Sequence, residues 1–286
     1  MLKNYTDFIK CYYLEETDLE NKGKEFYEKY FLEKNYPIFL WDVGAWATRK
    51  AVRDKVTHRS GRLLELGCGL GIFLREMMPQ FECWGMDISS ATLEIARKYS
   101  EPNINFIQGD IRNLPFPDNF FDVITSSHTL EHIPNDQKVI EEVYRVLKPN
   151  GELVIWVPGG ISGESDRRSL KERGHLRVYN SARFRRLFSK FSDFKIVEIV
   201  YMHRIHNLIW NQTKRLLRYP NFIVKLIKKD GKNIYQRKIY QKRIFPFMLR
   251  TLDFFDSLVN KKEESVFNYF RWSPYNVLLR AVKGQE

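Results

Sequence analysis

Residues 63–71, LLELGCGLG, contain an apolar strand that runs directly into a glycine-rich turn. Three glycines at alternate positions allow positive φ angles, and they let a ligand approach the backbone without meeting a Cβ atom. A helix is predicted over 72–78, immediately after the turn. Strand, turn and helix in this order are typical of an α/β sheet that binds a nucleoside, although three glycines can also mark a tight structural turn.

Strands and helices continue to alternate after this turn. Strands are predicted at 81–87, 103–108, 121–126 and 152–157, and helices at 90–99 and 136–147. The connections are too short for anything but βαβ units, so the sheet is predicted to be parallel.

Two acidic residues lie at the ends of neighbouring predicted strands, Asp87 and Asp110. A carboxylate at such a strand end can accept hydrogen bonds from both hydroxyls of a ribose. Each acid could instead be a helix cap or a loop residue. We favour a binding role because both fall at the carboxyl edge of the sheet, where open α/β folds bind ligands.

Five segments make the chain resemble the class I S-adenosylmethionine-dependent methyltransferases, and among them the broad family related to the ubiquinone-pathway methyltransferases. These segments are LLELGCGLG, GMDIS, QGDIRNLPF, FDVITSSHTLEHI and RVLKPNGELVIWVP, within roughly residues 40–202. The resemblance implies an α/β, Rossmann-like seven-stranded sheet with an antiparallel last strand, N-terminal helices that cover the site, and S-adenosylmethionine as the cofactor.

The resemblance also implies a role for each matching position. The residues expected to contact the methionine half of the cofactor are Glu65, Gly67, Cys68, Gly69 and Gly71. Those expected at the ribose and adenine are Asp87, Ile88, Asp110 and Ile111, and those expected near the transferred methyl group are Ser126 and Ser127.

Three histidines and one glutamate are the candidate bases of this site. A neutral hydroxyl acceptor must lose a proton during methyl transfer, and a histidine or carboxylate near the methyl group can remove it. The candidates are His128, Glu131, His132 and His175. His128 follows a strand end and is favoured to face the acceptor, whereas His132 can simply pack at a helix start and His175 can cap its loop.

No metal is expected at these histidines. Family members with Glu-x-x-Glu-His at this place can bind a divalent cation, but His128 replaces the first glutamate here. The segment also lacks the Asn-Pro-Pro-Tyr and Pro-Cys patterns of amino-group and cytosine methylation, which leaves an oxygen acceptor as the default.

Four regions are predicted along the chain. A helical cover at 1–58 precedes a cofactor-binding core at 59–202, which is followed by a helical insert at 203–272 and the last strand of the core at 273–286. Strands predicted at 194–202 and 275–283 would form the antiparallel pair that closes the sheet.

The insert carries the charge of the protein. The net charge is +12, and residues 201–286 contain 18 Lys and Arg against 6 Asp and Glu, so residues 1–200 are neutral. Three interpretations of the insert stay open: a solvated helical cap, a patch on an anionic membrane near a lipid-linked acceptor, and nucleic-acid binding. No RNA-binding motif is recognisable, which disfavours the third.

The sequence therefore predicts a methyltransferase that acts on a small-molecule or lipid-linked acceptor of glycan or quinone type. The alternatives are a non-catalytic protein with this fold that binds a membrane or a partner, and an RNA methyltransferase. Three cysteines without paired spacing and no secretory signal predict a cytoplasmic protein, peripheral to the inner face of the membrane if the insert binds lipid.

Overall fold

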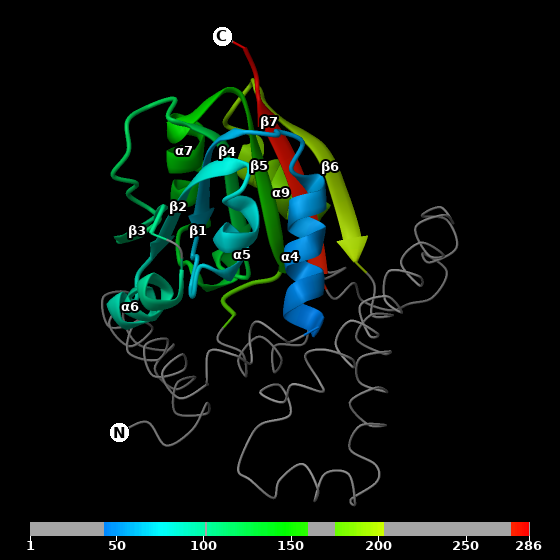
Figure 1. Cartoon of the computed structure of the whole chain (residues 1–286). Helices are drawn as coiled ribbons and strands as arrows, with labels where there is room; N and C mark the ends of the chain where they lie inside the picture. The colour runs from blue at the N-terminus through cyan, green and yellow to red at the C-terminus, as the bar shows by residue number, and fades with distance from the viewer. Residues whose placement is uncertain (1–42, 101, 160–174, 203–275, 286) are drawn as a thin grey trace, which may run out of the picture. The chain divides into compact units, whose positions relative to one another are not determined.

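The computed structural model describes residues 43–100, 102–159, 175–202 and 276–285. The elements, shown in Figure 1, are α4 (Val43–Lys55), β1 (Gly61–Leu66), α5 (Ile72–Met77), β2 (Phe81–Asp87), α6 (Ser90–Tyr99), β3 (Ile104–Gln108), β4 (Phe121–Ser127), η1 (Leu130–His132), α7 (Asp136–Val146), β5 (Leu147–Pro158), α9 (Ser181–Phe188), β6 (Phe194–Met202) and β7 (Asn276–Lys283).

The strands of the described ranges form one seven-stranded sheet in the order β3-β2-β1-β4-β5-β7-β6. Neighbours from β3 to β5 are parallel, whereas β7 is antiparallel to both β5 and β6. This confirms the predicted Rossmann-like sheet with an antiparallel last strand. The strand order reverses between β1 and β4, and a crevice at such a reversal is where open α/β sheets bind ligands.

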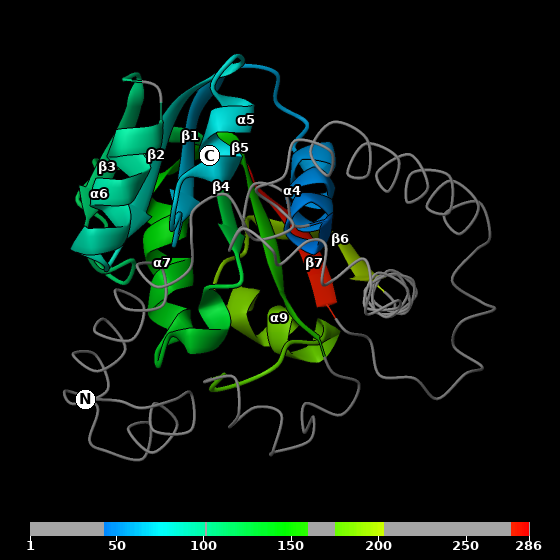
Figure 2. The ribbon, with the colours of Figure 1, turned by 60° about the horizontal axis from the view of Figure 1, so that its bottom comes forward.

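Helices lie on both faces of the sheet (Figures 1 and 2). Apolar side chains of the strands alternate between two cores, one on each face. Leu63 packs with Val52 of α4 and with apolar residues of α5 and α6, while its neighbour Leu64 packs with α7 and α9. Successive strand side chains point to opposite faces, so this alternation makes a sheet that is covered by helices on both sides.

The predicted boundary between α7 and β5 was wrong. Strand β5 begins at Leu147, five residues before the predicted start, and α7 accordingly ends at Val146. Leu147 is fully buried and pairs with Phe121 of β4, so the strand starts before the Pro149–Gly151 stop signal. Asn150, with φ of 61°, lies in the left-handed region within that signal.

Polar side chains cap the starts of α6 and α9. Ser89 caps α6 by accepting a hydrogen bond from the backbone N–H of Thr92 at 3.2 Å. Asn180 caps α9 in the same manner, since its side chain accepts from the backbone N–H of Arg183 at 2.9 Å.

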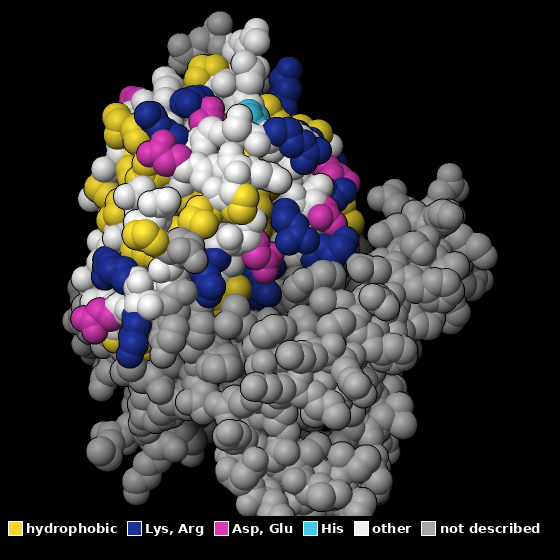
Figure 3. Space-filling view, viewed as in Figure 1, with side chains coloured by type: hydrophobic (Ala, Val, Ile, Leu, Met, Phe, Trp, Pro, Cys, Tyr) yellow, Lys and Arg dark blue, Asp and Glu magenta, His cyan; other side chains and the backbone are white. Residues whose placement is uncertain are grey.

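The chain divides into two compact units, one of 1–34, 50–202 and 274–286 and one of 35–49 and 203–273. Only 43–49 of the second unit belong to the described residues, so the predicted insert at 203–272 lies outside them, as does most of the predicted cover at 1–58. Among the described helices, none has the length and apolar character needed to cross a bilayer. Positive and negative side chains are mixed on the described face shown in Figure 3.

Candidate functional site

The glycine turn after β1 has the backbone conformation that its sequence predicts. Gly67, Gly69 and Gly71 have φ angles of 69°, 51° and 65°. The amides of Gly67 and Cys68 both donate to the carbonyl of Met86, at 2.8 and 3.0 Å, which fixes the turn against the end of β2. Only glycine takes three such angles without strain, so the alternate spacing is a structural requirement of this turn.

Asp87, the last residue of β2, closes this turn from the side. Its carboxylate accepts hydrogen bonds from the backbone N–H of Gly69 at 2.9 Å and from that of Ser89 at 3.0 Å. Burial raises the pKa of the Asp87 carboxyl, although the backbone donors partly oppose this. The side chain therefore bridges the glycine turn and the start of α6, at the edge where a ribose is expected.

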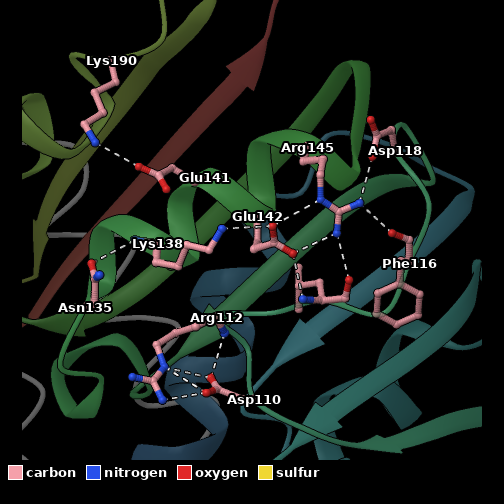
Figure 4. Close-up of polar contacts among 11 residues, drawn as sticks. Asp110, Arg112, Phe116, Asp118, Asn135, Lys138, Glu141, Glu142, Arg145 and Lys190 are labelled. Carbon is pink, nitrogen blue, oxygen red and sulfur yellow. Dashed lines mark hydrogen bonds and ion pairs between the residues drawn. The ribbon is translucent and has the colours of Figure 1, made fainter. Parts of the chain in front are cut away.

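Asp110, after β3, is held by a residue that the sequence analysis did not single out. Arg112 donates from Nε and from a terminal nitrogen to the Asp110 carboxylate, at 2.7 to 3.1 Å (Figure 4). Burial raises the pKa of Asp110, but the hydrogen bonds with Arg112 outweigh burial and lower it. A carboxylate has four acceptor positions, so it can still accept from an adenine amino group.

The loop that carries Asp110 is fastened to α7. Arg145 donates to the carbonyls of Leu114 and Phe116, and Glu142 accepts from the backbone N–H of Leu114 at 2.8 Å (Figure 4). Arg145 and Glu142 also pair with each other at 2.8 Å. This clamp fixes the path of the chain that follows the predicted adenine-binding residues.

A buried glutamate gathers the three candidate histidines after β4. Glu131 is fully buried, and its Oε1 lies 3.2 Å from His128 Nδ1 and 3.9 Å from His132 Nε2. The His132 and His175 rings meet edge to face, with centroids 4.9 Å apart. Burial raises the pKa of Glu131, but the hydrogen bond with His128 and the nearby imidazoles outweigh burial and lower it.

Three of these side chains could also hold a cation. One ligand atom each from Glu131, His132 and His175 lie within 4.8 Å of one another. Imidazole nitrogens and a carboxylate oxygen are ligands that several divalent transition metals accept. The expectation that no metal binds here therefore stays a prediction.

The remaining predicted residues lie along the same edge of the sheet. Ser126 is fully buried and donates to the carbonyl of Leu66 at 3.4 Å, which joins β4 to β1 at the crevice. Ile111 is buried, whereas Ile88 is 37 % exposed beside Asp87. Burial raises the pKa of the Cys68 thiol well above its usual value, so this residue contributes its backbone rather than a thiolate.

Besides Arg112, two further residues of the site were missed by the sequence analysis. Thr129 donates to the carbonyls of Leu66 and Ser127, both at 3.2 Å, and a Cβ on Gly67 would lie 2.2 Å from its hydroxyl. Trp156 of β5 donates its indole N–H to Nε2 of His128 at 3.1 Å. Thr129 lies within a quoted motif and could have been noticed there, whereas nothing in the local sequence points to Trp156.

Comparisons with known proteins agree with this geometry. Residues 64–155 match the family model for a methyltransferase domain. The chain is 34% identical over 113 residues to a demethylmenaquinone methyltransferase of Thermus thermophilus, covering 37% of this chain and 51% of the relative. A Geobacillus protein of the same name is 37% identical over 105 residues, covering 34% of this chain and 45% of the relative. The chain thus spans about half the length of these relatives.

Solved structures are similar in fold. A Haemonchus contortus phosphoethanolamine N-methyltransferase 2, in complex with S-adenosyl-L-methionine, superposes with a TM-score of 0.60 at 20% identity, covering 85% of this chain and 53% of that one. The YcgJ protein of Bacillus subtilis superposes with a TM-score of 0.53 at 18% identity, covering 84% of this chain and 100% of that one.

Proposed function

Because the chain belongs to the class I S-adenosylmethionine-dependent methyltransferases, we propose that it transfers a methyl group from S-adenosylmethionine to a hydroxyl of a small acceptor. The observation that carries this proposal is the glycine turn. Three left-handed glycines join β1 to α5 beside the strand-order reversal, and Asp87 from the next strand contacts the same turn.

The residues present fit the proposed cofactor. The glycine turn allows close approach of a ligand, and the Asp87 carboxylate lies where it can accept from the ribose hydroxyls. Asp110 and the buried Ile111 follow the neighbouring strand and would contact the adenine. Glu65, the penultimate residue of β1, is a buried carboxylate and would face the methionine half together with Gly67, Cys68, Gly69 and Gly71.

When bound, the cofactor supplies an electrophilic methyl group on a sulfonium. The protein contributes position, because an acceptor held in line with the S–CH₃ bond reacts without the entropic cost of encounter. It also contributes proton removal. The histidines around Glu131 are His128, directly after β4, His132 of η1 and His175 from the segment before α9, and an imidazole of this cluster would take the proton of an acceptor hydroxyl.

We propose an acceptor with a quinone-type or lipid-linked character. The demethylmenaquinone methyltransferases among the relatives support a quinone-type acceptor. In its reduced form such an acceptor carries hydroxyls that lose a proton more easily than those of a sugar. The basic residues of 201–286 support a site at an anionic membrane on the cytoplasmic side. Cosedimentation with vesicles that contain anionic lipid tests this, and retention only in the supernatant would contradict it.

Calorimetric titration of S-adenosylmethionine and S-adenosylhomocysteine tests the proposed function. Wild-type protein should bind both, and Asp87→Ala should weaken binding about tenfold to a hundredfold, as expected for the loss of hydrogen bonds to a charged group. Glu82→Ala is the matched control, because Glu82 is an exposed acid at the start of the same strand. Folded wild-type protein that binds neither compound would overturn the proposal.

A further inference from the structure

His128 is held in one tautomer by the residue that donates to it. The indole N–H of Trp156 is a donor only, so Nε2 of His128, 3.1 Å away, must accept with its lone pair. The proton of the neutral imidazole is then on Nδ1, which lies 3.2 Å from Glu131 Oε1 and donates to it. Trp156 is buried, with 4 % of its surface exposed, so water does not compete strongly for its N–H.

The backbone holds His128 in the same place. Its amide donates to the carbonyl of Trp156 at 2.8 Å, and its φ of 52° puts it in the left-handed region. This conformation is uncommon for residues other than glycine, although asparagine, aspartate and histidine adopt it more readily than most. Both the main chain and the side chain of Trp156 therefore fix the position of residue 128.

This arrangement separates His128 from the other two histidines. His128 cannot take a proton on Nε2 without losing the bond from Trp156, and its Nδ1 already carries one. Glu131, which it orients, also faces His132 at 3.9 Å, and His175 packs against His132. The groups around the Glu131 carboxylate are thus His128 from the end of β4, His132 from η1 and His175 from the segment before α9.

We infer that His128 is a positioning residue, which Trp156 and Glu131 hold in the tautomer that donates to Glu131, and that it is not the base that removes the proton of the acceptor. The inference rests on the proposed function for its role in catalysis, but the tautomer can be measured without it. It departs from the sequence-based preference for His128 as the base that faces the acceptor.

The first test is ¹⁵N NMR of the full chain labelled at histidine, with the His128 signals assigned by their loss in His128→Asn. Wild-type protein at neutral pH should show a protonated Nδ1 and an unprotonated Nε2 at residue 128. Glu131 still accepts from Nδ1 when Trp156 is replaced, so Trp156→Phe combined with Glu131→Gln removes both partners and should produce a mixture of tautomers. A protonated Nε2 in the wild type, or an unchanged tautomer in a folded protein with both substitutions, would overturn the inference.

The second test separates positioning from base catalysis without changing Trp156. His128→Gly keeps the left-handed backbone but removes the donor to Glu131, whereas His128→Asn keeps both, since the asparagine amide nitrogen occupies the place of Nδ1. With S-adenosylmethionine and 1,4-dihydroxynaphthalene as the acceptor probe, His128→Gly should lower kcat about tenfold to a hundredfold, as losses of orienting partners do. His128→Asn should recover most of that loss.

Equal losses of about a hundredfold or more in both variants would show that His128 is the base and would overturn the inference. If wild-type protein binds S-adenosylmethionine but does not methylate the probe, the proposed acceptor class fails instead. The NMR result then decides the role of His128 by itself.

Discussion

Glu131 and Glu152 are two glutamates with the same burial and different surroundings. Both side chains have no exposed surface. Glu152 pairs with Val123 near the start of β4, whereas Glu131 follows the carboxyl end of that strand. They therefore lie toward opposite edges of the same sheet, and only one of those edges is where such sheets bind ligands.

Donors that are mostly fixed surround Glu152. Its carboxylate accepts from the backbone amides of Thr57 and His58 at 2.7 and 2.8 Å, from the Thr57 hydroxyl at 3.0 Å and from Arg280 Nε at 2.9 Å. One imidazole is also present, since His58 Nδ1 lies 3.1 Å from Glu152 Oε1. Burial raises the pKa of Glu152, but these donors outweigh burial and lower it. The cluster joins the segment before β1 to β5 and β7.

Glu131 is surrounded instead by imidazoles, which gain and lose protons under mild conditions. A buried carboxylate is costly in either place and must be compensated. Backbone amides and arginine stabilise the buried carboxylate permanently and contribute to the stability of the fold. Imidazoles stabilise it to a degree that depends on which of their nitrogens are protonated. The comparison teaches that burial alone does not distinguish a structural acid from a functional one, and that the donors do.

The largest expected effect is on stability, from Glu152→Ala. Removing one partner of a buried ion pair leaves Arg280 and two backbone amides without their acceptor, which should cost about 3–5 kcal/mol in the free energy of unfolding. Urea denaturation measures this. The control is Glu198→Ala, which breaks the half-exposed pair of Lys55 and Glu198 and should cost less than about 1 kcal/mol. Equal losses in the two variants would contradict the structural role of Glu152.

Glu131→Gln should act on catalysis rather than on stability. Glutamine keeps the size of the side chain but removes the charge that orients the histidines, so methyl transfer to 1,4-dihydroxynaphthalene should fall about tenfold to a hundredfold. Binding of S-adenosylmethionine should stay the same. Glu141→Gln, at a partly exposed glutamate on α7 that pairs with Lys190, is the control and should change neither. A loss of stability without a change in kcat would contradict the distinction drawn here.

The pH dependence of stability should show the fixed donors of Glu152. Because its folded pKa is lowered, the stability that it contributes is present above the pKa of an unfolded glutamate, about 4.3, and is lost as the pH falls through the folded value. The difference in unfolding free energy between wild type and Glu152→Gln should therefore be constant near neutral pH and shrink below about pH 4. A difference that grows on acidification would contradict the sign of the shift.

Chelation should have the smallest effect. If Glu131, His132 and His175 handle protons, treatment with EDTA should change methyl transfer by less than about twofold. A loss of tenfold or more that one divalent metal restores would assign the three side chains to a cation instead, because their ligand atoms lie within 4.8 Å of one another.

The sequence correctly predicted the features of the site that depend on the order of the strands. The ends of parallel strands lie at one edge, so the placement of Asp87, Asp110 and Ser126 follows once βαβ units are recognised. The left-handed conformation of the glycines could also be predicted, because only glycines at that spacing allow the turn. The early start of β5 could not, since the burial of Leu147 depends on its pairing with Phe121.

The chemistry of the histidine cluster depended on contacts between distant segments. His128 lies before η1 in a left-handed conformation, His132 ends η1, and both side chains approach Glu131. The donor that sets the tautomer of His128 comes from β5, 28 residues later. Such a contact has no local pattern, and only the register of β4 and β5 brings it about.

The position of β7 has a consequence for how the protein is made. β7 lies between β5 and β6, so during synthesis β6 leaves the ribosome before the strand that must attach it to the sheet. Until residues 276–283 emerge, a nascent chain in which β1 to β5 have paired has no partner for the outer edge of β5. That edge carries side chains such as Val154 and Ile155, which are fully buried in the finished protein. An open apolar strand edge is a template for aggregation. Synthesis of residues 203–275 thus sets how long the nascent chain needs protection, for which a chaperone is the ordinary means.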